Sequence, residues 1–308
     1  MPIVLQETLR GLLYAPFYAA LALDAYREEG VEVRFVSAPR PGEAARGLLD
    51  GTVDVSWGGP MRVMETYEKH PDCDLVCFCE VVTRDPFCLV GRGARPDFQL
   101  ADLVGMTIAT VSEVPTPWLC LQEDIRRAEL DPGAIDRISD RGMVENLSAL
   151  REGKIAAVQL FEPLIEEALA DGTCSIWHAA AERGPTSYTT FYARRPLLAR
   201  RRPELAAMIR AIYRTQKWFH ATAGAEIART IARFFPDQPE GRLAAAIDRY
   251  KRLGVWGKNP RLPRSGYDRL KAGLVSGGFV TRGTGYEVAV DNTLAEHVTA
   301  EDPPALVR

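Results

Sequence analysis

Apolar and polar positions alternate along the first 90 residues with two different periods. Residues 31–36 alternate at every second position, which is the period of a β-strand. Residues 16–28 instead gather apolar side chains on one stripe at helical spacing, and Gly30 follows as a stop signal. The pattern predicts strands at residues 3–8, 31–36, 53–57 and 75–82, and helices at residues 16–28, 42–50 and 60–69.

A second series of the same kind begins after the Asp85-Pro86 dipeptide. Its strands are predicted at residues 87–90, 106–110, 135–139, 156–160 and 187–193, and its helices at residues 117–130, 144–152 and 162–169. From Arg195 onward the pattern predicts helices at residues 203–222, 224–234, 239–253 and 263–276, before an end that is Gly- and Thr-rich and then polar. Strands separated by helices are typical of parallel sheets that are covered on both faces.

The two series predict two α/β lobes. We expect residues 1–85 to form the first lobe and residues 86–187 the second. Residues 188–308, with a return strand and the C-terminal helices, are expected to complete the first lobe. The chain therefore crosses between the lobes twice, near residues 83–86 and 184–189, and both crossings are rich in Pro, Gly and Thr.

The length of the chain indicates its number of domains, and its charge excludes some classes of partner. The chain has 308 residues, with 38 Lys and Arg against 41 Asp and Glu, which gives a formal charge of −3. This length is enough for about two domains, each with its own core. The balanced charge argues against a nucleic-acid partner, and no apolar run approaches the ~20 residues of a membrane span.

The N-terminus bears on where the protein acts. Met1-Pro2 leads directly into the first predicted strand, without the basic and apolar segments of a signal peptide. We therefore expect a cytoplasmic protein if Met1 is the native start. If a leader has been trimmed, we expect a periplasmic or otherwise extracytoplasmic protein.

The cysteines and histidines do not form a metal-binding pattern. Cys77 and Cys79 flank Phe78, so a regular strand places both thiols on one face, as small buried hydrophobic groups. The four histidines lie far from any Cys-x-x-Cys pair, a motif that the chain lacks. We expect no metal site and no cofactor.

Four segments in a fixed order resemble a known family. They are residues 14–20 (Tyr-Ala-Pro-Phe-Tyr-Ala-Ala), 30–33 (Gly-Val-Glu-Val), 51–55 (Gly-Thr-Val-Asp-Val) and 161–163 (Phe-Glu-Pro). In this order and spacing they are similar to the solute-binding proteins of ABC importers for nitrate, sulfonates, taurine and thiamine-pyrimidine precursors. The resemblance covers residues 3–250.

The resemblance implies a fold and a function. The fold is a Venus flytrap of the periplasmic-binding-protein type, in which two parallel-type α/β lobes are joined by two hinge crossings and close on a ligand. The C-terminal helices are expected to pack on the first lobe. The implied function is to bind a small solute for import, as a monomer that delivers its ligand to an ABC permease and does not insert into a membrane.

Candidate ligand contacts follow the predicted strands, because ligands of open parallel sheets lie outside the carboxyl ends of the strands. Trp57 is the strongest aromatic candidate, since Gly58 and Gly59 beside it leave the backbone accessible. Arg62 is the candidate partner for an anionic group. The full set of candidate ligand-binding residues is Tyr14, Phe17, Arg40, Trp57, Gly58, Gly59, Arg62, Ser112, Glu113, Thr116, Trp118, Phe161, Glu162 and Tyr188.

Several of these residues also have a purely structural interpretation. The aromatic side chains can belong to the core, and Arg40 and Arg62 can be solvated surface groups. Glu162 precedes a predicted helix, where a carboxylate interacts favourably with the helix dipole. As a ligand site, the set favours an aromatic or heterocyclic solute that can carry an anionic group.

The same superfamily includes enzymes, and their signatures are missing. Thiamine-pyrimidine synthases carry a lysine and a histidine just after the third strand, where this chain has residues 57–62 (Trp-Gly-Gly-Pro-Met-Arg). Their cysteine-rich motif is absent, and the Cys77-Phe78-Cys79 run lies in another strand. Aryl-sulfinate desulfinases use a cysteine after the first strand, where this chain has Tyr14-Ala15-Pro16. We expect a binding protein with no catalytic residue, and a cytosolic enzyme on this scaffold or a cytosolic ligand sensor as alternatives.

Overall fold

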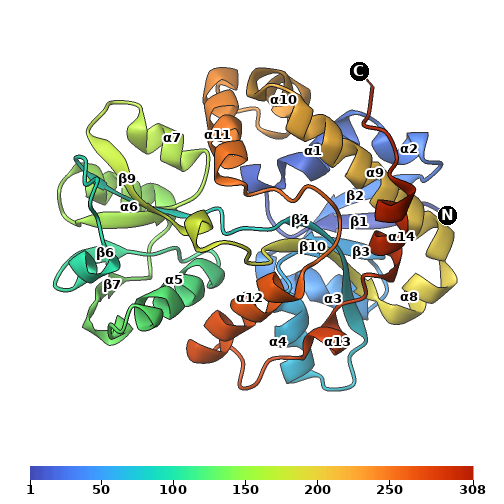
Figure 1. Ribbon diagram of the computed structural model, residues 1–308, viewed down its shortest axis with the longest axis horizontal. Coiled ribbons are helices and arrows are strands. Elements are labelled where there is room, and N and C mark those ends of the chain that lie inside the picture. Colours follow the sequence, from blue (N-terminus) through green and yellow to red (C-terminus); the bar gives the residue numbers. More distant parts are fainter. Residues whose placement is uncertain (308) are drawn as a thin grey trace.

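The strands of the computed structural model, which describes residues 1–307, form two sheets of five. The first sheet has the order β2 (Val33–Ser37), β1 (Ile3–Glu7), β3 (Val55–Gly58), β10 (Thr189–Arg194), β4 (Leu75–Val82). The second has the order β7 (Asp136–Ile138), β6 (Thr107–Ala109), β8 (Ala157–Leu160), β5 (Cys88–Arg92), β9 (Cys174–Ala179). Each sheet is the centre of one lobe, and Figure 1 shows the two lobes side by side. The prediction of two α/β lobes is confirmed.

Both sheets are mixed. Strand β1 pairs in parallel with β2 and β3, and β6 pairs in parallel with β7 and β8, as the alternation of strands and helices predicts. Strand β10 is antiparallel to β3 and β4, because it brings the chain back from the second lobe. Strand β5, which carries the chain into the second sheet, is antiparallel to β8 and β9.

Helices cover the first sheet on both faces. One layer is formed by α9 (Arg202–Ala221), which packs on α1 (Ala15–Ala22), α2 (Ala25–Glu28) and α14 (Thr293–Glu301). The other layer contains α3 (Ala44–Leu49), α4 (Met61–Lys69) and α12 (Arg264–Ser276). Further helices are α8 (Arg195–Arg200), α10 (Gly224–Ile231), α11 (Glu240–Leu253) and α13 (Tyr286–Ala289). None of the helices in residues 1–307 has the length and apolar character that crossing a bilayer requires.

The second sheet is covered in the same way. Helix α5 (Thr116–Arg127) buries Leu121 and Ile125 against Leu89 and Ile108 of the sheet. The opposite face carries α6 (Met143–Arg151) and α7 (Leu164–Leu169), which contact β5. Both lobes therefore have the three-layer build of an α/β domain.

Two C-terminal helices touch both lobes. Helix α11 packs on α10 and also on α7 of the second lobe, and α12 packs on α4 and also on α5. In Figure 1 both orange helices lie at the boundary between the lobes. The approach of α12 is close, because a Cβ atom added at Gly273 would lie 2.9 Å from the carbonyl oxygen of Leu119 in α5. The C-terminal helices thus connect the lobes besides completing the first one.

A buried ion-pair cluster holds the two crossing segments together. Arg183, at the end of the second lobe, donates from Nη1 to Oδ2 of Asp85 in the first crossing, at 2.5 Å. Its Nε donates to Oδ2 of Asp124 in α5, at 2.7 Å. The Arg183 side chain is 5% exposed and that of Asp85 is fully buried. Since a buried charge is stable only with its partners in place, this cluster fixes the course of both crossings.

A β-bulge in β4 changes the interpretation of the two cysteines. Phe191 of β10 is opposite Cys79 and Tyr192 is opposite Cys77, so Phe78 is an extra residue in the ladder. Cys77 therefore packs in the cluster that contains α4 and α12, whereas Cys79 packs in the cluster that contains α1 and α9. The prediction that both thiols share one face is wrong, because the bulge shifts the side-chain alternation by one residue.

The sequence pattern misses some short elements. Strand β9 (Cys174–Ala179) is an edge strand in which half-buried residues outnumber fully buried ones, so it lacks a continuous apolar run. The helix α14 lies in the polar C-terminal segment and buries only Leu294, Ala295 and Val298. These elements are stabilised by contacts with β5 and α9, which a local pattern does not report.

Strand β4 also buries one carboxyl group. Glu80 is 2% exposed, and within residues 1–307 its Oε1 atom has no hydrogen-bond partner. Burial raises the pKa of Glu80 from its ordinary value of 4.5 to about 8, although the hydroxyls of Ser187 and Thr83 favour the charged form. The folded protein therefore keeps this carboxyl largely protonated at neutral pH.

This buried acid predicts that stability falls as pH rises. The unfolded chain ionises Glu80 near pH 4.5, whereas the folded chain does so near pH 8, so the unfolded state binds fewer protons between these values. We expect the free energy of unfolding to decrease by a few kcal/mol across this interval and then to level off. Urea denaturation at a series of pH values measures it.

The Glu80→Gln variant is the matched control, because it keeps the shape of the side chain and removes the titration. Its unfolding free energy should decrease less over the same pH interval, whatever its absolute stability. Equal slopes for the two proteins would show that Glu80 ionises normally in the fold.

Candidate functional site

A cavity of about 60 Å³ lies between the two lobes. The first lobe contributes residues that follow β1, β2 and β3, and the second lobe contributes residues that follow β6 and β8. The carboxyl ends of both sheets therefore face the same space, as expected for an α/β ligand site. The wall is formed by Thr8, Leu9, Leu13, Tyr14, Pro41, Gly59, Met61, Arg62, Phe87, Val114, Thr116, Phe161 and Tyr188.

Two helices begin at this cavity from opposite lobes. Met61 is the first residue of α4 and Thr116 is the first residue of α5. Thr116 Oγ1 donates to Met61 Sδ at 2.6 Å, so the lobes are in contact here. Because the N-terminus of a helix carries partial positive charge, both helices favour an anionic group between them.

Tyrosine and threonine hydroxyls supply the polar part of the wall. The Tyr14 hydroxyl lies 3.2 Å from Thr8 Oγ1. The Tyr188 hydroxyl is buried and has no partner within residues 1–307. Burial raises the pKa of both phenols above the ordinary value of 10, so each stays protonated and can donate a hydrogen bond. An unpartnered buried donor at a cavity is a group that a ligand can satisfy.

Arg62 is the one positively charged residue among the described residues of the wall. Its side chain is only 12% exposed, and Nη1 donates to Oε2 of Glu65 at 2.7 Å. This ion pair lies within one turn of α4 and holds the guanidinium at the start of the helix. The cation and the helix terminus thus lie on the same side of the cavity.

Six of the residues predicted from the sequence meet at the cavity. They are Tyr14, Gly59, Arg62, Thr116, Phe161 and Tyr188. The other eight predicted residues do not line it: Phe17, Arg40, Trp57, Gly58, Ser112, Glu113, Trp118 and Glu162.

Trp57 lies in the core of the first lobe. Its indole is fully buried between Phe17, whose ring is stacked at a centroid distance of 4.6 Å, and Phe35, stacked at 5.3 Å. Trp57 and Phe17 are therefore core residues, which is the structural interpretation of their place in the sequence. The Phe17 and Phe35 rings cover the faces of the Trp57 indole that are predicted to contact a ligand.

Gly58 is required by packing. A Cβ atom at this position would lie 2.7 Å from Thr8 Cγ2 and 3.3 Å from the Tyr192 hydroxyl. The glycine allows Thr8 to reach the cavity wall from β1, which places a hydroxyl there. Gly58 thus shapes the site without lining it.

Four more predicted residues serve other contacts. Arg40 is exposed and pairs with Glu43, and Ser112 is exposed beside Glu113. Glu113 Oε1 accepts from the backbone N–H of Met143 at 3.0 Å, at the start of α6. Trp118 is half-buried, with the Arg137 guanidinium 4.5 Å from the centre of its ring. Arg40 thus makes a surface contact in the first lobe, and Glu113 and Trp118 make contacts within the second lobe.

Glu162 connects the lobes. Its Oε1 accepts from Arg249 Nη1 of α11 at 2.5 Å, and its Oε2 accepts from the backbone N–H of Glu166 at 3.0 Å. Its own backbone N–H donates to the Tyr250 hydroxyl at 2.8 Å. Burial raises the pKa of this carboxyl, while the Arg249 guanidinium acts in the opposite direction. The carboxylate is thus part of an interlobe contact.

The list of candidate ligand-binding residues leaves out seven of the described wall residues: Thr8, Leu9, Leu13, Pro41, Met61, Phe87 and Val114. Thr8 directly follows β1, so the rule that ligands lie beyond strand ends could have identified it. Phe87 comes from a crossing segment, and only the arrangement of the lobes brings it to the cavity.

The described wall lacks several side-chain types that are common in covalent and acid–base catalysis. Among the residues that line this cavity in the described chain there is no Lys, His, Cys, Asp or Glu. Pyridoxal phosphate held as a Schiff base requires a lysine, so these residues do not fit that group. Residues 1–307 also contain no cluster of three or more His, Cys, Asp or Glu side chains that could hold a metal ion. The arrangement can bind a solute through one guanidinium, hydroxyl groups and aromatic rings.

Comparison with known protein families identifies the family of this chain. The model of the NMT1/THI5-like family matches residues 13–223, more than half of the chain. The chain belongs to the NMT1/THI5-like family. The matched range includes the first crossing, the whole second lobe and β10, together with every residue of the cavity wall except Thr8 and Leu9.

Several proteins similar to this chain are named as binding proteins. The chain is 24% identical to a putative binding protein, YtlA, of Bacillus subtilis over 300 residues, which cover 96% of this chain and 89% of YtlA. The periplasmic aliphatic sulphonate binding protein SsuA of Escherichia coli has a TM-score of 0.73 at 14% identity, covering 90% and 92% of the two chains. A ligand-binding component of an ABC-type import system of Staphylococcus aureus has a TM-score of 0.73 at 14% identity, covering 97% and 99%. The fold is that of the periplasmic binding proteins.

The ion pair between Glu162 and Arg249 predicts a measurable coupling. Replacing Arg249 by Met leaves the Glu162 carboxylate buried without its cation, and we expect a loss of about 3 kcal/mol in the free energy of unfolding at neutral pH. Urea denaturation measures the loss. It should shrink as pH is lowered, because the isolated carboxyl then takes up a proton.

A double-mutant cycle with Glu162→Gln separates this effect from lost packing. Arg249→Met should cost much less in the Glu162→Gln background than in the wild type. The same cost in both backgrounds would show that the two side chains are not coupled.

Proposed function

We propose that this protein is the solute-binding component of an ABC-type import system. The observation that carries the proposal is the cavity between the lobes, which faces the carboxyl ends of both sheets and offers binding groups but no Lys, His, Cys, Asp or Glu in its described wall. Membership of the NMT1/THI5-like family and the likeness to import proteins support it. The protein would bind its solute unchanged and present it to a permease.

Movement of the lobes is part of the proposal. Tyr14, Thr116, Phe87 and Tyr188 are each less than one-tenth exposed, so a solute reaches them only after the lobes separate. The crossings are the segments about which such a hinge turns. Closure then surrounds the solute with both walls, as in other two-lobed receptors.

The wall supports a small, flat solute with an anionic group. Arg62 and the N-termini of α4 and α5 supply positive charge, and the Tyr188 hydroxyl supplies a free donor. Phe87 and Phe161, with ring centroids 5.2 Å apart, offer apolar ring surface. A heterocyclic or aromatic carboxylate or sulfonate fits this combination.

The proposed partner is an ABC permease, and the proposed location is the periplasm or the outer side of the cytoplasmic membrane. The relatives support both points, since one is named as periplasmic and another as part of an import system. A monomer suits this role, because the receptor docks on the permease with one surface across both lobes.

Thermal-shift screening tests the proposed function. The panel contains nitrate, aryl and alkyl sulfonates, aromatic carboxylates, pyrimidines and flavins. One solute is expected to raise the stability by about 3–4 kcal/mol at 100–1,000 times its dissociation constant, and to be recovered unchanged.

Variants assign the binding to the interlobe cavity. Arg62→Met and Tyr188→Phe should each weaken the solute about tenfold, the effect of losing one good hydrogen bond to a ligand. Arg40→Met is the matched control, since Arg40 is an exposed arginine of the same lobe outside the cavity. Turnover of the solute, or unchanged binding by Arg62→Met, would contradict the proposal.

A further inference from the structure

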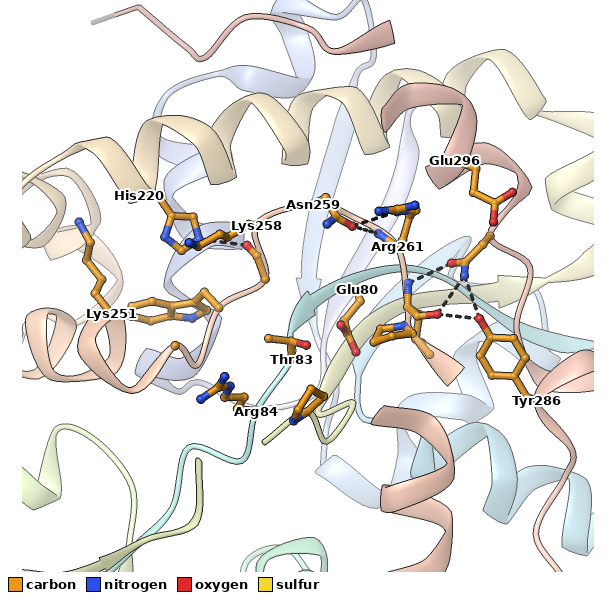
Figure 2. A pocket seen from close by; sticks show the side chains of 17 residues that line it. Glu80, Thr83, Arg84, His220, Lys251, Lys258, Asn259, Arg261, Tyr286 and Glu296 are labelled. Carbon is orange, nitrogen blue, oxygen red and sulfur yellow. Dashed lines mark hydrogen bonds between the residues drawn. The ribbon is translucent and has the colours of Figure 1, made fainter. Parts of the chain in front are cut away.

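A second and larger cavity lies beside the crossing segments. It has a volume of about 660 Å³ and shares no described wall residue with the interlobe cavity. Its wall includes Thr83 and Arg84 of the first crossing and Pro185 of the second. We refer to this space, shown in Figure 2, as the hinge-side cavity. Cavities of a few hundred Å³ are typical of sites for small organic molecules.

A buried acid points into the hinge-side cavity. Figure 2 shows the Glu80 carboxyl between Thr83 and the segment that carries Asn259 and Arg261. Glu80 is 2% exposed and its Oε1 atom forms no hydrogen bond in the described chain, although the Ser187 and Thr83 hydroxyls are close enough to lower the pKa of the carboxyl. An unsatisfied buried acceptor is rare in folded proteins and needs an explanation.

The protonation state of Glu80 determines which ligand groups it can pair with. With a pKa of about 8, the Glu80 carboxyl is largely protonated at neutral pH and has one oxygen to accept and one O–H to donate. Such a group pairs with a ligand edge that holds an N–H donor next to an acceptor. A free carboxylate would instead attract a cation.

The remaining wall of the hinge-side cavity carries positive charge. Within residues 1–307, no carboxylate forms an ion pair with any of its four cationic side chains. These cationic residues are Arg84, Lys251, Lys258 and Arg261.

The contacts of these cations leave the charge uncompensated. Arg84 and Lys251 donate to backbone carbonyls, and Arg261 contacts the Asn259 side chain. Lys258 and Arg261 are exposed at the rim, as is Glu296, the one other acid of the wall. A cavity with this excess of cations favours an anionic occupant.

We propose that the hinge-side cavity is a second ligand-binding site, for a small anionic molecule that also carries an N–H donor beside an acceptor. The anionic group binds among Lys258, Arg261 and Arg84, and the donor–acceptor edge pairs with the Glu80 carboxyl. Such a molecule satisfies the orphaned oxygen and the uncompensated charge at the same time.

The position of this site links it to the interlobe cavity. Trp256, in the wall of the hinge-side cavity, donates from its indole to the carbonyl oxygen of Leu13 at 2.7 Å, and Leu13 lines the interlobe cavity. An occupant would also touch both crossing segments. If the proposed function holds, the two sites are coupled through the hinge, and each ligand changes the affinity of the other by the same factor.

The test uses 6-aminonicotinate, which has an aminopyridine edge at one end of the ring and a carboxylate at the other. Isothermal titration of the full chain at millimolar concentrations should show saturable binding. Nicotinate lacks the amino donor and 2-aminopyridine lacks the anion, so each should bind at least about tenfold more weakly. Absence of saturable binding by 6-aminonicotinate would overturn the proposal.

Variants locate the binding. The double variant Lys258→Ala/Arg261→Ala changes only exposed rim residues, so it should fold, and it should weaken 6-aminonicotinate about tenfold or more. Arg252→Ala, on α11 but outside the wall, is the matched control and should bind normally. Glu80→Leu, which removes both the acceptor and the donor, should weaken 6-aminonicotinate more than nicotinate, whereas Glu80→Gln keeps an acceptor beside a donor and should retain binding.

The Arg62→Met variant keeps this test separate from the proposed function. It removes the cation of the interlobe cavity, so binding of 6-aminonicotinate at the hinge-side cavity should not change. Binding that is lost in Arg62→Met and retained in Lys258→Ala/Arg261→Ala would place the molecule between the lobes and overturn the second site. The solute screen gives its own result in either case.

Discussion

The two-lobed arrangement depends on the buried guanidinium of Arg183. It pairs with Asp85 in one crossing and with Asp124 in α5, so it joins the crossing segments to each other and to the second lobe. If either carboxylate moves away, this deeply buried charge loses its compensation and the fold is destabilised by several kcal/mol. This cost restricts the path of both crossings. That path decides which strand ends face one another, and therefore where a ligand site can form.

Both cavities follow from this constraint. On one side of the crossings, α4 and α5 begin against each other and enclose Arg62, Tyr14 and Tyr188. On the other side, β4 carries Glu80 under the segment of residues 254–263 and leaves a larger space. The C-terminal helices add contacts across the lobes, above all the ion pair of Arg249 with Glu162. Hinge motion has to overcome the free energy of these contacts.

Much of the fold is readable from local patterns. The alternation at residues 31–36 marks β2 (Val33–Ser37), and the apolar run at residues 75–82 has the bounds of β4. Local patterns fail where pairing decides the outcome. Strand β9 forms because it can pair with the edge of β5. The bulge at Phe78 forms because the register between β10 and β4 shifts by one residue there. Neither partner is adjacent in the sequence.

The sequence by itself determined the two series of strands and helices, and hence which loops follow strand ends; that rule alone brings Tyr14, Arg62 and Thr116 to the cavity wall. Only the tertiary structure decided which way the other side chains point. Trp57 follows the same rule and is buried between two rings, and Glu162 pairs with an arginine 87 positions away. The reason is physical: hydrophobic periodicity and the Gly, Pro and Asp residues between the runs indicate the strand ends along the chain, whereas the neighbours of a side chain are set by the packing of distant segments.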